Sequence, residues 1–548
     1  MPINKPFALD RRAGVRRGSA LLFLFACVLC VGVRADARRA PRPLSHAEAV
    51  RLYADETPPA ALAGKLRALL TTPFVSNGAR GAGPLSPSSP RLGRFLRVAF
   101  WNVARGTELP LIKLAFTDPE GFAAKLDAKR YPPGSDERKR VLEQAEVLRQ
   151  ADVIVLNEAD WGLKRSGYRN VAEELARAAG MNYAFGVEFV EVDPISTGTE
   201  RFEGMKPEER REVLDIIRVE PSRFRGLHGS AILSRYRLEN VRLVPFEFQA
   251  HDWYADEKGG VSKLEKLKRD VGNEILLSKV RREVRRGGRM MLTAEIADAG
   301  LPGGRATVVA THLENRAEPS KRRRQLRELL DNIKAIRHPV ILAGDMNTSG
   351  SDLSPTSIKN ELRKRLGSPS FWGTLALRSV TGIGLLDIFA ARTLKSRLVG
   401  ADPTVRSVPL IAPNKEAEFF EDLKEFRFAD GNAFDYRGEE GRSTGGRDDT
   451  LSNSNERADK GFVATNYVEV LGGFSVGSKL DWIFVKPPSL TDPGDEKQPH
   501  RFAPHFGRTL AELNNAPGDG ISDHHPITAD LPFAEPPPPA APDTSGSN

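Results

Sequence analysis

Polar side chains recur along this chain at the points where apolar, β-rich segments end. The residues in these positions are Asn102, Glu158, His312, Asp345, Asn347, Asp481, Asp523 and His524. One carboxylate after a strand is typical of a turn residue or a helix cap. Six strand ends that supply only Asn, Asp, Glu and His are not explained by turns and helix caps alone. Because open α/β sheets place ligands beyond the carboxyl ends of their strands, we expect these side chains to meet in one crevice.

The residue types in this set predict a particular chemistry. Carboxylate and amide oxygens are ligands for a hard cation such as Mg²⁺ or Mn²⁺, whereas zinc sites use clustered cysteine and histidine. His312 and His524 add groups that exchange protons near neutral pH. A cation that neutralises phosphate charge, together with a base that activates water, is suited to the hydrolysis of phosphoesters.

The elements that must position these side chains follow from the hydrophobic pattern. Short apolar runs rich in β-branched residues predict strands, and apolar residues at three- to four-residue spacing predict amphipathic helices. The predicted strands are residues 96–101, 152–156, 228–233, 305–311, 339–343 and 479–485, and the predicted helices are residues 137–150, 169–179 and 320–336.

Six short motifs follow one another in order, namely Trp101-Asn102, Asn157-Glu158, residues 311–315 (THLEN), 344–347 (GDMN), 479–482 (KLDW) and 522–526 (SDHHP). From about residue 95 to residue 532 the chain thereby resembles the endonuclease/exonuclease/phosphatase superfamily. That superfamily includes deoxyribonucleases, abasic-site endonucleases, neutral sphingomyelinases and inositol-polyphosphate phosphatases. The resemblance implies an α+β fold, a four-layer α/β sandwich of two packed mixed β-sheets flanked by helices. The site is expected at one end of the sheets.

The resemblance also implies a metal site for Mg²⁺ or Mn²⁺. Glu158 resembles the principal metal carboxylate of the superfamily, and Asn102 resembles the direct or water-bridged ligand beside it. Asp523 resembles a further ligand of the metal or of its water.

Five further positions resemble the catalytic residues of the superfamily. Asp345 matches the carboxylate that orients or deprotonates the attacking water, and Asn347 matches the side chain that steadies a phosphate oxygen. His524 matches the histidine that contacts the scissile phosphate and transfers a proton, with Asp481 as its orienting partner. His312 resembles a general acid of the deoxyribonuclease and sphingomyelinase branches.

Two departures distinguish this chain within the superfamily. Many relatives have glutamine before the metal glutamate, and the shorter Asn157 is expected to leave a nearby contact unmade. Asp481 is followed by Trp482, where inositol-polyphosphate phosphatases usually have arginine, so that branch is disfavoured. Residues 157–193 and 452–462 resemble a bacterial secreted subgroup without an assigned substrate.

The N-terminal residues predict export. Residues 1–35 carry six basic residues against one aspartate, and so account for five of the nine net positive charges. A basic segment before the apolar run of residues 20–33 predicts a signal peptide over residues 1–35 and a secreted or periplasmic protein, with an N-terminal membrane anchor as the alternative. Cys27 and Cys30 both lie in this run, so the exported chain has no disulfide and no thiolate ligand.

The rest of the chain divides by composition. A helical N-terminal extension with a Gly/Pro/Ser-rich linker or strap is expected over residues 36–94, and the catalytic domain over residues 95–532. Insertions are expected near residues 258–286 and 428–461, and a disordered proline-rich tail over residues 533–548.

The sequence leaves three functions open. A phosphodiesterase that acts on nucleic acid is slightly favoured by the His312/His524 pair and by basic clusters at residues 279–289 and 321–324, although the exported chain is nearly neutral. The first alternative hydrolyses phospholipid head groups, since a basic helix with an apolar stripe over residues 258–286 suits peripheral membrane contact. The second is a non-catalytic binding module, which the complete set of candidate residues disfavours. No stable protein partner is implied.

Overall fold

The computed structural model describes residues 40–79, 83–201, 207–259, 283–347, 417–435, 437, 466–470, 474–478, 480–495, 497–517 and 520–537. The chain divides into two compact units, Met1–Ala40 and Pro41–Asn548, and the elements below belong to the second. The predicted signal peptide, residues 260–282, most of the second predicted insertion and the chain after residue 537 lie outside the described residues. No helix within the described ranges has the length and apolar character needed to cross a membrane.

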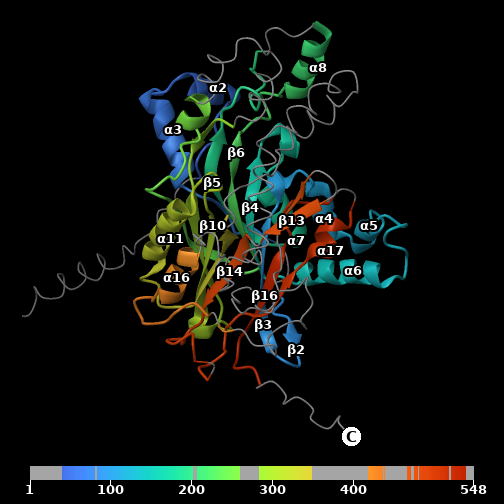
Figure 1. The fold of residues 1–548 in the computed structure, drawn as a ribbon, viewed down its shortest axis with the longest axis vertical. Coiled ribbons are helices and arrows are strands. Elements are labelled where there is room, and N and C mark those ends of the chain that lie inside the picture. The colour runs from blue at the N-terminus through green and yellow to red at the C-terminus, as the bar shows by residue number, and fades with distance from the viewer. Residues whose placement is uncertain are drawn as a thin grey trace, which may run out of the picture. The chain divides into compact units, whose positions relative to one another are not determined.

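Two mixed β-sheets form the centre of the Pro41–Asn548 unit (Figure 1). The first sheet has the order β1-β5-β6-β4-β3-β16-β15, with β2 paired to β3 and β8 paired to β5. Its strands are β1 Phe74–Ser76, β2 Ser88–Ser89, β3 Gly93–Asn102, β4 Val153–Trp161, β5 Asn182–Glu191, β6 Leu227–Ser234, β8 Arg285–Gly287, β15 His505–Thr509 and β16 Ile527–Pro532. The second sheet has the order β14-β11-β10-β9-β7. Its strands are β7 Leu238–Pro245, β9 Met290–Ala297, β10 Arg305–His312, β11 Val340–Asp345 and β14 Asp481–Lys486, and a separate hairpin pairs β12 Asn466–Val470 with β13 Phe474–Ser478.

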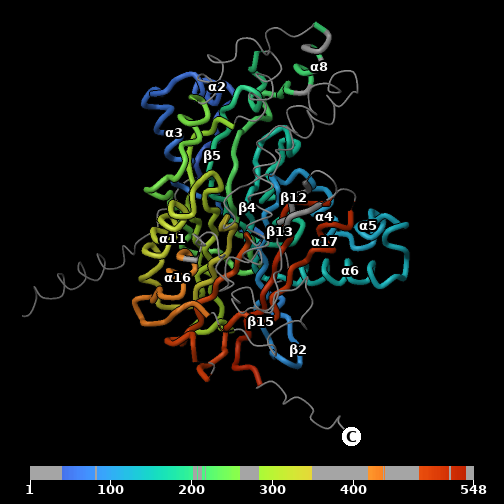
Figure 2. The backbone as a smooth tube through the Cα atoms, viewed as in Figure 1, coloured from blue at the N-terminus to red at the C-terminus, as the bar shows by residue number. Residues whose placement is uncertain are grey.

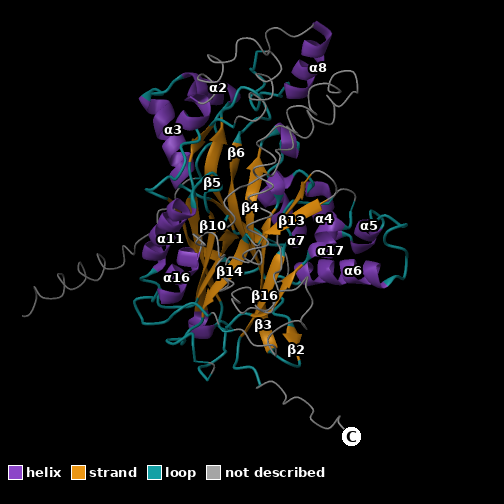
Figure 3. Ribbon diagram, viewed as in Figure 1, coloured by secondary structure: helices purple, strands orange, loops and turns teal. Residues whose placement is uncertain are grey.

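Helices cover the outer faces of both sheets (Figure 3). Those that pack on the first sheet include α2 His46–Ala54, α3 Ala60–Thr71, α4 Leu109–Thr117, α5 Pro119–Ala123, α6 Asp136–Arg149, α7 Val171–Ala179 and α17 Ala511–Asn515. The second sheet is covered by α11 Pro319–Ile333 and α16 Ala417–Glu425. The remaining elements are α8 Pro207–Ile217 and the short 3₁₀ turns η1 Ala104–Gly106, η2 Lys164–Ser166 and η3 Pro302–Gly304. The order helix, sheet, sheet, helix confirms the predicted four-layer sandwich.

Strand β3 shows why the central strands are almost continuously apolar. Side chains alternate between the two faces of a strand. Leu96, Val98 and Phe100 therefore point into the core between the sheets, while Ala99 and Trp101 point toward the helices. Both faces are buried, as is usual where helices cover a sheet. Each predicted strand and helix is present in the structure, with ends shifted by a few residues.

The N-terminal extension packs on the same core as the central strands. Leu52 of α2 and Leu69 of α3 are fully buried in it, and β1 pairs with β5. Within the stretch predicted as a linker or strap, the backbone N–H groups of Leu85 and Ser86 donate to the carboxylate of Asp152 at 2.6 and 3.1 Å. At the other end of the chain, the red C-terminal segment runs beside the blue β3 segment (Figure 2), where β16 pairs antiparallel with β3.

Candidate active site

The inner faces of the strands change from apolar to polar at one edge of the sandwich. Along β10, Val308 and Ala310 lie in the core between the sheets, and the next residue on that face is His312. The same alternation leads from Ala343 to Asp345 in β11. It also leads from Phe100 to Asn102 in β3 and, in the reverse direction, from Ile483 to Asp481 in β14. The polar residues predicted from the sequence therefore lie where the apolar core between the two sheets ends.

Strand register brings these residues together. Parallel pairing of β10 with β11 places His312 opposite Asp345, and antiparallel pairing of β11 with β14 places Asp345 opposite Asp481. In the first sheet, parallel pairing of β3 with β4 places Asn102 opposite Asn157. The two sheets meet at this edge, because the Asn102 amide nitrogen donates to Asp345 Oδ2 at 3.2 Å.

Two acidic side chains reach the site from β-bulges on either side of β6. The bulge in β4 contains Glu158, and the bulge in β5 contains Glu188. Both lie against Gly229 of β6, which pairs with Ala159 on one side and with Val187 on the other. A bulge re-aims the side chain that it carries. Glu158 has a φ of 52°, a left-handed conformation that costs energy outside glycine and often marks functional positions.

Asp345 is the buried centre of the site. Its backbone N–H donates to Asn157 Oδ1 at 2.9 Å, and its Oδ1 accepts the backbone N–H of Asn347 at 2.9 Å. The Asn347 amide nitrogen in turn donates to the carbonyl of Leu313 at 2.9 Å. The carboxylate is therefore held in one orientation, with Oδ2 toward the two histidines.

His524 is held by a carboxylate on its far side. Its Nδ1 lies 2.9 Å from Asp481, and its Nε2 lies 3.6 Å from Asp345 Oδ2. Burial by itself would lower the pKa of His524, but Asp481, Asp345 and Asp523 raise that pKa well above its ordinary value. The imidazole is consequently protonated at neutral pH and is a donor on both nitrogens.

His312 has the opposite protonation state. Its Nε2 lies 3.6 Å from Asp345 Oδ2, and its Nδ1 lies 3.8 Å from Glu188. Burial, followed by the positive charges of Arg289, His228 and His524, lowers the pKa of His312 well below its ordinary value. The ring is therefore neutral at neutral pH.

Glu158 lies between an amide and a guanidinium. It accepts from the Asn102 amide nitrogen at 3.3 Å and from Arg105 Nε at 3.4 Å. Although burial would raise the pKa of Glu158, Arg105, His228, His524 and the Asn102 hydrogen bond lower it below the ordinary value. The carboxylate is ionised, as a metal ligand must be.

Asn157, the residue before the candidate metal glutamate, uses both ends of its side-chain amide. Besides accepting from Asp345, it donates to the Ser230 hydroxyl at 2.7 Å, and Ser230 donates to Glu188. The Asn157 side chain thus joins the two sheets through Asp345, and through Ser230 it connects to Glu188 within the first sheet.

The described arginines of the two basic clusters have partners inside the protein. Arg285 pairs with Glu191 and Glu283, Arg289 with Glu188 and Glu314, and Arg323 with Asp422. Arg322 is buried and donates to the carbonyl of Ala317 at 2.6 Å. These four side chains stabilise the folded chain and lend no support to a nucleic-acid substrate, whereas Lys321 and Arg324 are exposed and residues 279–282 lie outside the described residues.

The donor set fits a hard divalent cation. Glu158 and Asp345 are both buried, and both accept from the one amide group of Asn102, so two carboxylates face each other at close range. Asp345 and Asp481 also lie close together, in a group whose third member is His524 and whose polar atoms are within 4.8 Å of one another; the protonated His524 is a donor in this group and not a ligand. Carboxylate oxygens in such a cluster suit Mg²⁺ or Mn²⁺.

The structure brings together seven of the eight residues singled out from the sequence, through hydrogen bonds or contacts of 3.8 Å or less. These are Asn102, Glu158, His312, Asp345, Asn347, Asp481 and His524. Asp523 is half-buried beside Ser522, whose hydroxyl donates to it at 3.4 Å, and it raises the pKa of His524.

Sequence reasoning missed Glu188 and Arg105. Glu188 stands inside an otherwise apolar segment, Asn182–Glu191, and a charged residue within a buried strand was the available signal. Arg105 follows Asn102 in a turn and has a φ of 68°. No pattern in the sequence distinguishes Arg105 from the other arginines.

A two-sheet sandwich whose edge holds buried carboxylates and two carboxylate-paired histidines defines a metal-dependent phosphoesterase. The model of the Endonuclease/Exonuclease/phosphatase family matches residues 99–524. The chain therefore belongs to that family.

Solved structures resemble the chain at low sequence identity. An endonuclease/exonuclease/phosphatase from Beutenbergia cavernae is 16% identical over 80% of this chain and 72% of its own, with a TM-score of 0.32. The human Nocturnin catalytic domain is 13% identical over 80% and 92%, with a TM-score of 0.34. A 3′-5′ exonuclease from Neisseria meningitidis is 11% identical over 80% and 99%, with a TM-score of 0.33. No curated protein sequence matches the chain.

Proposed function

We propose that this phosphoesterase is a phosphodiesterase that hydrolyses nucleic acid. The observation that carries the proposal is the convergence of two histidines on one carboxylate oxygen: His312 Nε2 and His524 Nε2 both lie 3.6 Å from Asp345 Oδ2. Cleavage of a diester requires removal of a proton from water and, in the same reaction, a proton for the leaving alkoxide. Asp345 can accept the proton of the water, and a histidine beside it can supply the proton for the leaving group.

Asn102 and Glu158 would hold Mg²⁺ or Mn²⁺, with Asp523 as a further ligand directly or through water. The cation, when bound, neutralises phosphate charge and makes bound water more acidic. Ligation by Asn102 requires its Oδ1 to face Glu158, whereas in the structure Oδ1 accepts the backbone N–H of Ala104 at 3.1 Å. A half-turn of the amide would satisfy this requirement.

The other residues act on the substrate and on protons. Asp345 takes a proton from the attacking water through Oδ2, because Oδ1 is held by the backbone N–H of Asn347. One N–H of the Asn347 amide is bonded to Leu313, and the other is the donor for a phosphate oxygen. His524, kept protonated by Asp481, donates from Nε2 to the phosphate.

His312 is the candidate proton donor to the leaving group. Because its imidazole is neutral without substrate, it must first gain a proton. The monoanionic phosphodiester, bound within a few ångströms, favours the charged imidazole and raises its pKa. His312 thus gains its proton only in the substrate complex, with Glu188 3.8 Å from Nδ1 to stabilise the added charge.

The test is plasmid nicking by the purified protein, with Mg²⁺ and with chelator. Asp345→Asn keeps the shape of the central carboxylate and removes its charge, and Asp136→Asn, a side chain 80% exposed on α6, is the matched control. We expect metal-dependent nicking by the wild type and the control, and at least a hundredfold less by Asp345→Asn. No nicking by folded wild-type protein would refute the nucleic-acid substrate, and assays with phospholipid vesicles would follow. Full activity in Asp345→Asn would refute the site.

A further inference from the structure

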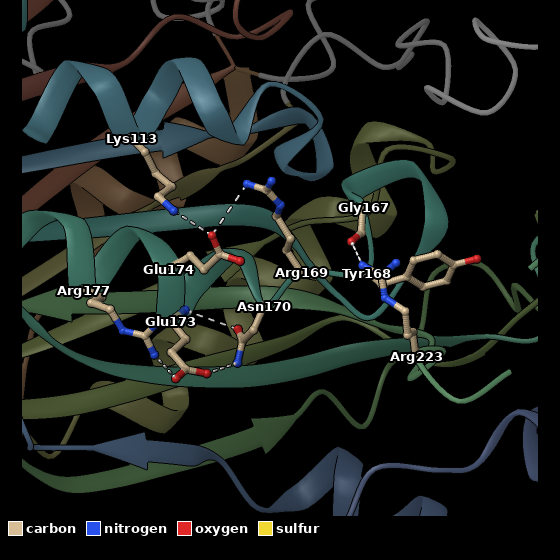
Figure 4. Close-up of a pocket in the computed structure, with 9 residues that line it drawn as sticks. All are labelled: Lys113, Gly167, Tyr168, Arg169, Asn170, Glu173, Glu174, Arg177 and Arg223. Atoms are coloured by element: carbon tan, nitrogen blue, oxygen red, sulfur yellow. Dashed lines mark hydrogen bonds and ion pairs between the residues drawn. The ribbon is translucent and has the colours of Figure 1, made fainter. Parts of the chain in front are cut away.

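A polar surface hollow of about 610 Å³ lies between α4, the turn after η2, and α7 (Figure 4). Its lining includes four basic and two acidic residues. Lys113 reaches down from α4, Arg169 and Tyr168 come from the turn, and Arg223 lies beside the tyrosine ring. We name this surface the Tyr168 hollow. None of its residues belongs to the catalytic cluster described above.

The Tyr168 hollow is built by the segments that directly follow the active-site strands. After Asn102 the chain turns through η1 into α4, and after Glu158 strand β4 runs to Trp161 and then into η2. Trp161 forms a β-bridge with Asn170, which lines the hollow. Three strand residues span about 10 Å, and a bridge adds about 5 Å. Because these two directions are roughly perpendicular, the hollow begins about 11 Å from the backbone of Glu158.

The charges of the hollow are not balanced within it. Lys113 and Arg169 share a single carboxylate oxygen of Glu174, at 2.8 and 3.7 Å, so one positive charge is left over. Arg177 pairs with Glu173 at 2.7 Å. The Arg169 side chain is 41% exposed, which leaves its guanidinium accessible to an anion.

Arg223 provides a second cation at the other end of the hollow. Its guanidinium lies 4.7 Å from the centre of the Tyr168 ring, donates to the carbonyl of Gly167 at 2.9 Å and pairs with Glu220 at 3.0 Å. These contacts fix its position while half of the side chain stays exposed. A preorganised guanidinium on an aromatic face is suited to phosphate and to stacked bases.

We propose that the Tyr168 hollow binds the phosphodiester backbone of a nucleic-acid strand whose scissile phosphate lies at Asp345. The inference rests on the proposed function and adds a substrate requirement to it. A rise of about 3.4 Å per stacked nucleotide places the contact about three nucleotides from the cleavage point. Arg169 and Arg223 are the phosphate contacts. Substrates of one or two nucleotides cannot reach them.

The test compares oligonucleotides of 2 and 12 nucleotides with bis(p-nitrophenyl) phosphate, using wild-type protein, Arg169→Ala, Arg223→Ala and a control. The control is Arg305→Ala, whose side chain is 55% exposed at the end of β10 opposite to His312. We expect the ratio of kcat/KM for the 12-mer to that for the small diester to fall roughly tenfold in each hollow variant and to stay constant in the control. Each lost phosphate contact to a single strand also reduces the slope of log KM against log salt by about 0.7.

The outcomes separate this proposal from the proposed function. Unchanged ratios and salt slopes in both hollow variants, with the 12-mer still cleaved, would overturn the Tyr168 hollow and leave the nuclease standing. Hydrolysis of the small diester or of phospholipid vesicles without cleavage of either oligonucleotide would overturn the nuclease itself, and the hollow with it. Cleavage of the 2-mer and the 12-mer at equal kcat/KM by wild type would also overturn the hollow.

Discussion

Gly229→Ala is the change that most directly tests how the site is built. A Cβ at position 229 would lie 1.9 Å from the carbonyl oxygen of Gly186 and 3.1 Å from the backbone nitrogen of Glu188. Real Cβ atoms essentially never come within 3.0 Å of such atoms. Neither the added Cβ nor the Gly186 carbonyl oxygen can rotate away, because both are fixed to the backbone. Strands β5 and β6 must therefore separate locally by about 1 Å.

The separation of β5 and β6 is expected to lower catalysis because it occurs beside the active site. Gly229 lies between the bulges that carry Glu158 and Glu188, so both carboxylates move relative to the residues of the second sheet. A misplacement of about 1 Å at a catalytic centre costs about a hundredfold in rate, or about 2.7 kcal/mol of transition-state stabilisation. Overpacking also lowers the free energy of unfolding by about 1–3 kcal/mol. We expect kcat/KM to fall about a hundredfold in a protein that still folds.

The assay is hydrolysis of bis(p-nitrophenyl) phosphate with Mg²⁺, together with urea unfolding of each variant. Gly64→Ala is the matched control, because Gly64 lies inside α3 and an added Cβ there meets no atom within 4 Å. A helix-interior Gly→Ala change of this kind stabilises by about 0.5–1 kcal/mol and is expected to leave kcat/KM unchanged. Wild-type kcat/KM in Gly229→Ala would refute the reasoning that this close approach positions the two carboxylates.

Three further predictions concern the histidine pair, the metal and the strap. Asp481→Asn is expected to lower kcat about 10- to 100-fold, because an amide no longer stabilises the protonated His524, and steady-state kinetics that show an unchanged kcat would contradict this. Chelation is expected to abolish hydrolysis. Mg²⁺ at about 100 times its Kd is expected to raise the free energy of unfolding by about 2.7 kcal/mol in the wild type and by less in Glu158→Gln. Thermal unfolding measures both gains, and equal gains would argue against Glu158 as a ligand. Burial raises the pKa of Asp152 to about 6, so the unfolded chain loses this proton first and the free energy of unfolding falls as the pH rises from about 4 to about 6. That fall amounts to roughly 3 kcal/mol, and urea unfolding at both pH values should show it in the wild type and not in Asp152→Asn.

Much of the fold was predictable because its signals are local. The runs around Val98, Val155 and Val308 are apolar on both faces, which indicates strands buried between two layers. Helix α7 begins at an asparagine cap and ends at Gly180 in a left-handed conformation, so its limits follow from adjacent residues. Strand β5 was not predicted, although its apolar content is high, because Glu188 and Gly186 interrupt the pattern.

The seven site residues that the structure brings together were also predictable from the sequence, since each is the first polar residue on an inner strand face or lies within a few residues of it. The chain order of the motifs around Asn102 and Asp345 sufficed to place them at one edge. Contacts between the sheets could not be predicted in this way. The hydrogen bond from Asn102 to Asp345 joins residues 243 positions apart, and only strand register and sheet packing bring them within 3.2 Å.

The sequence by itself determined the strands, the polar residues at their ends and the class of chemistry, because alternation and residue type are properties of neighbouring positions. Only the tertiary structure decided which charges pair. Arg289, Arg285 and Arg323, from the clusters that suggested a nucleic-acid surface, pair with Glu188, Glu191 and Asp422, which the fold brings from other parts of the chain. It also decided that Glu188 stands beside His312, because two bulges and a glycine, distant along the chain, meet across β6.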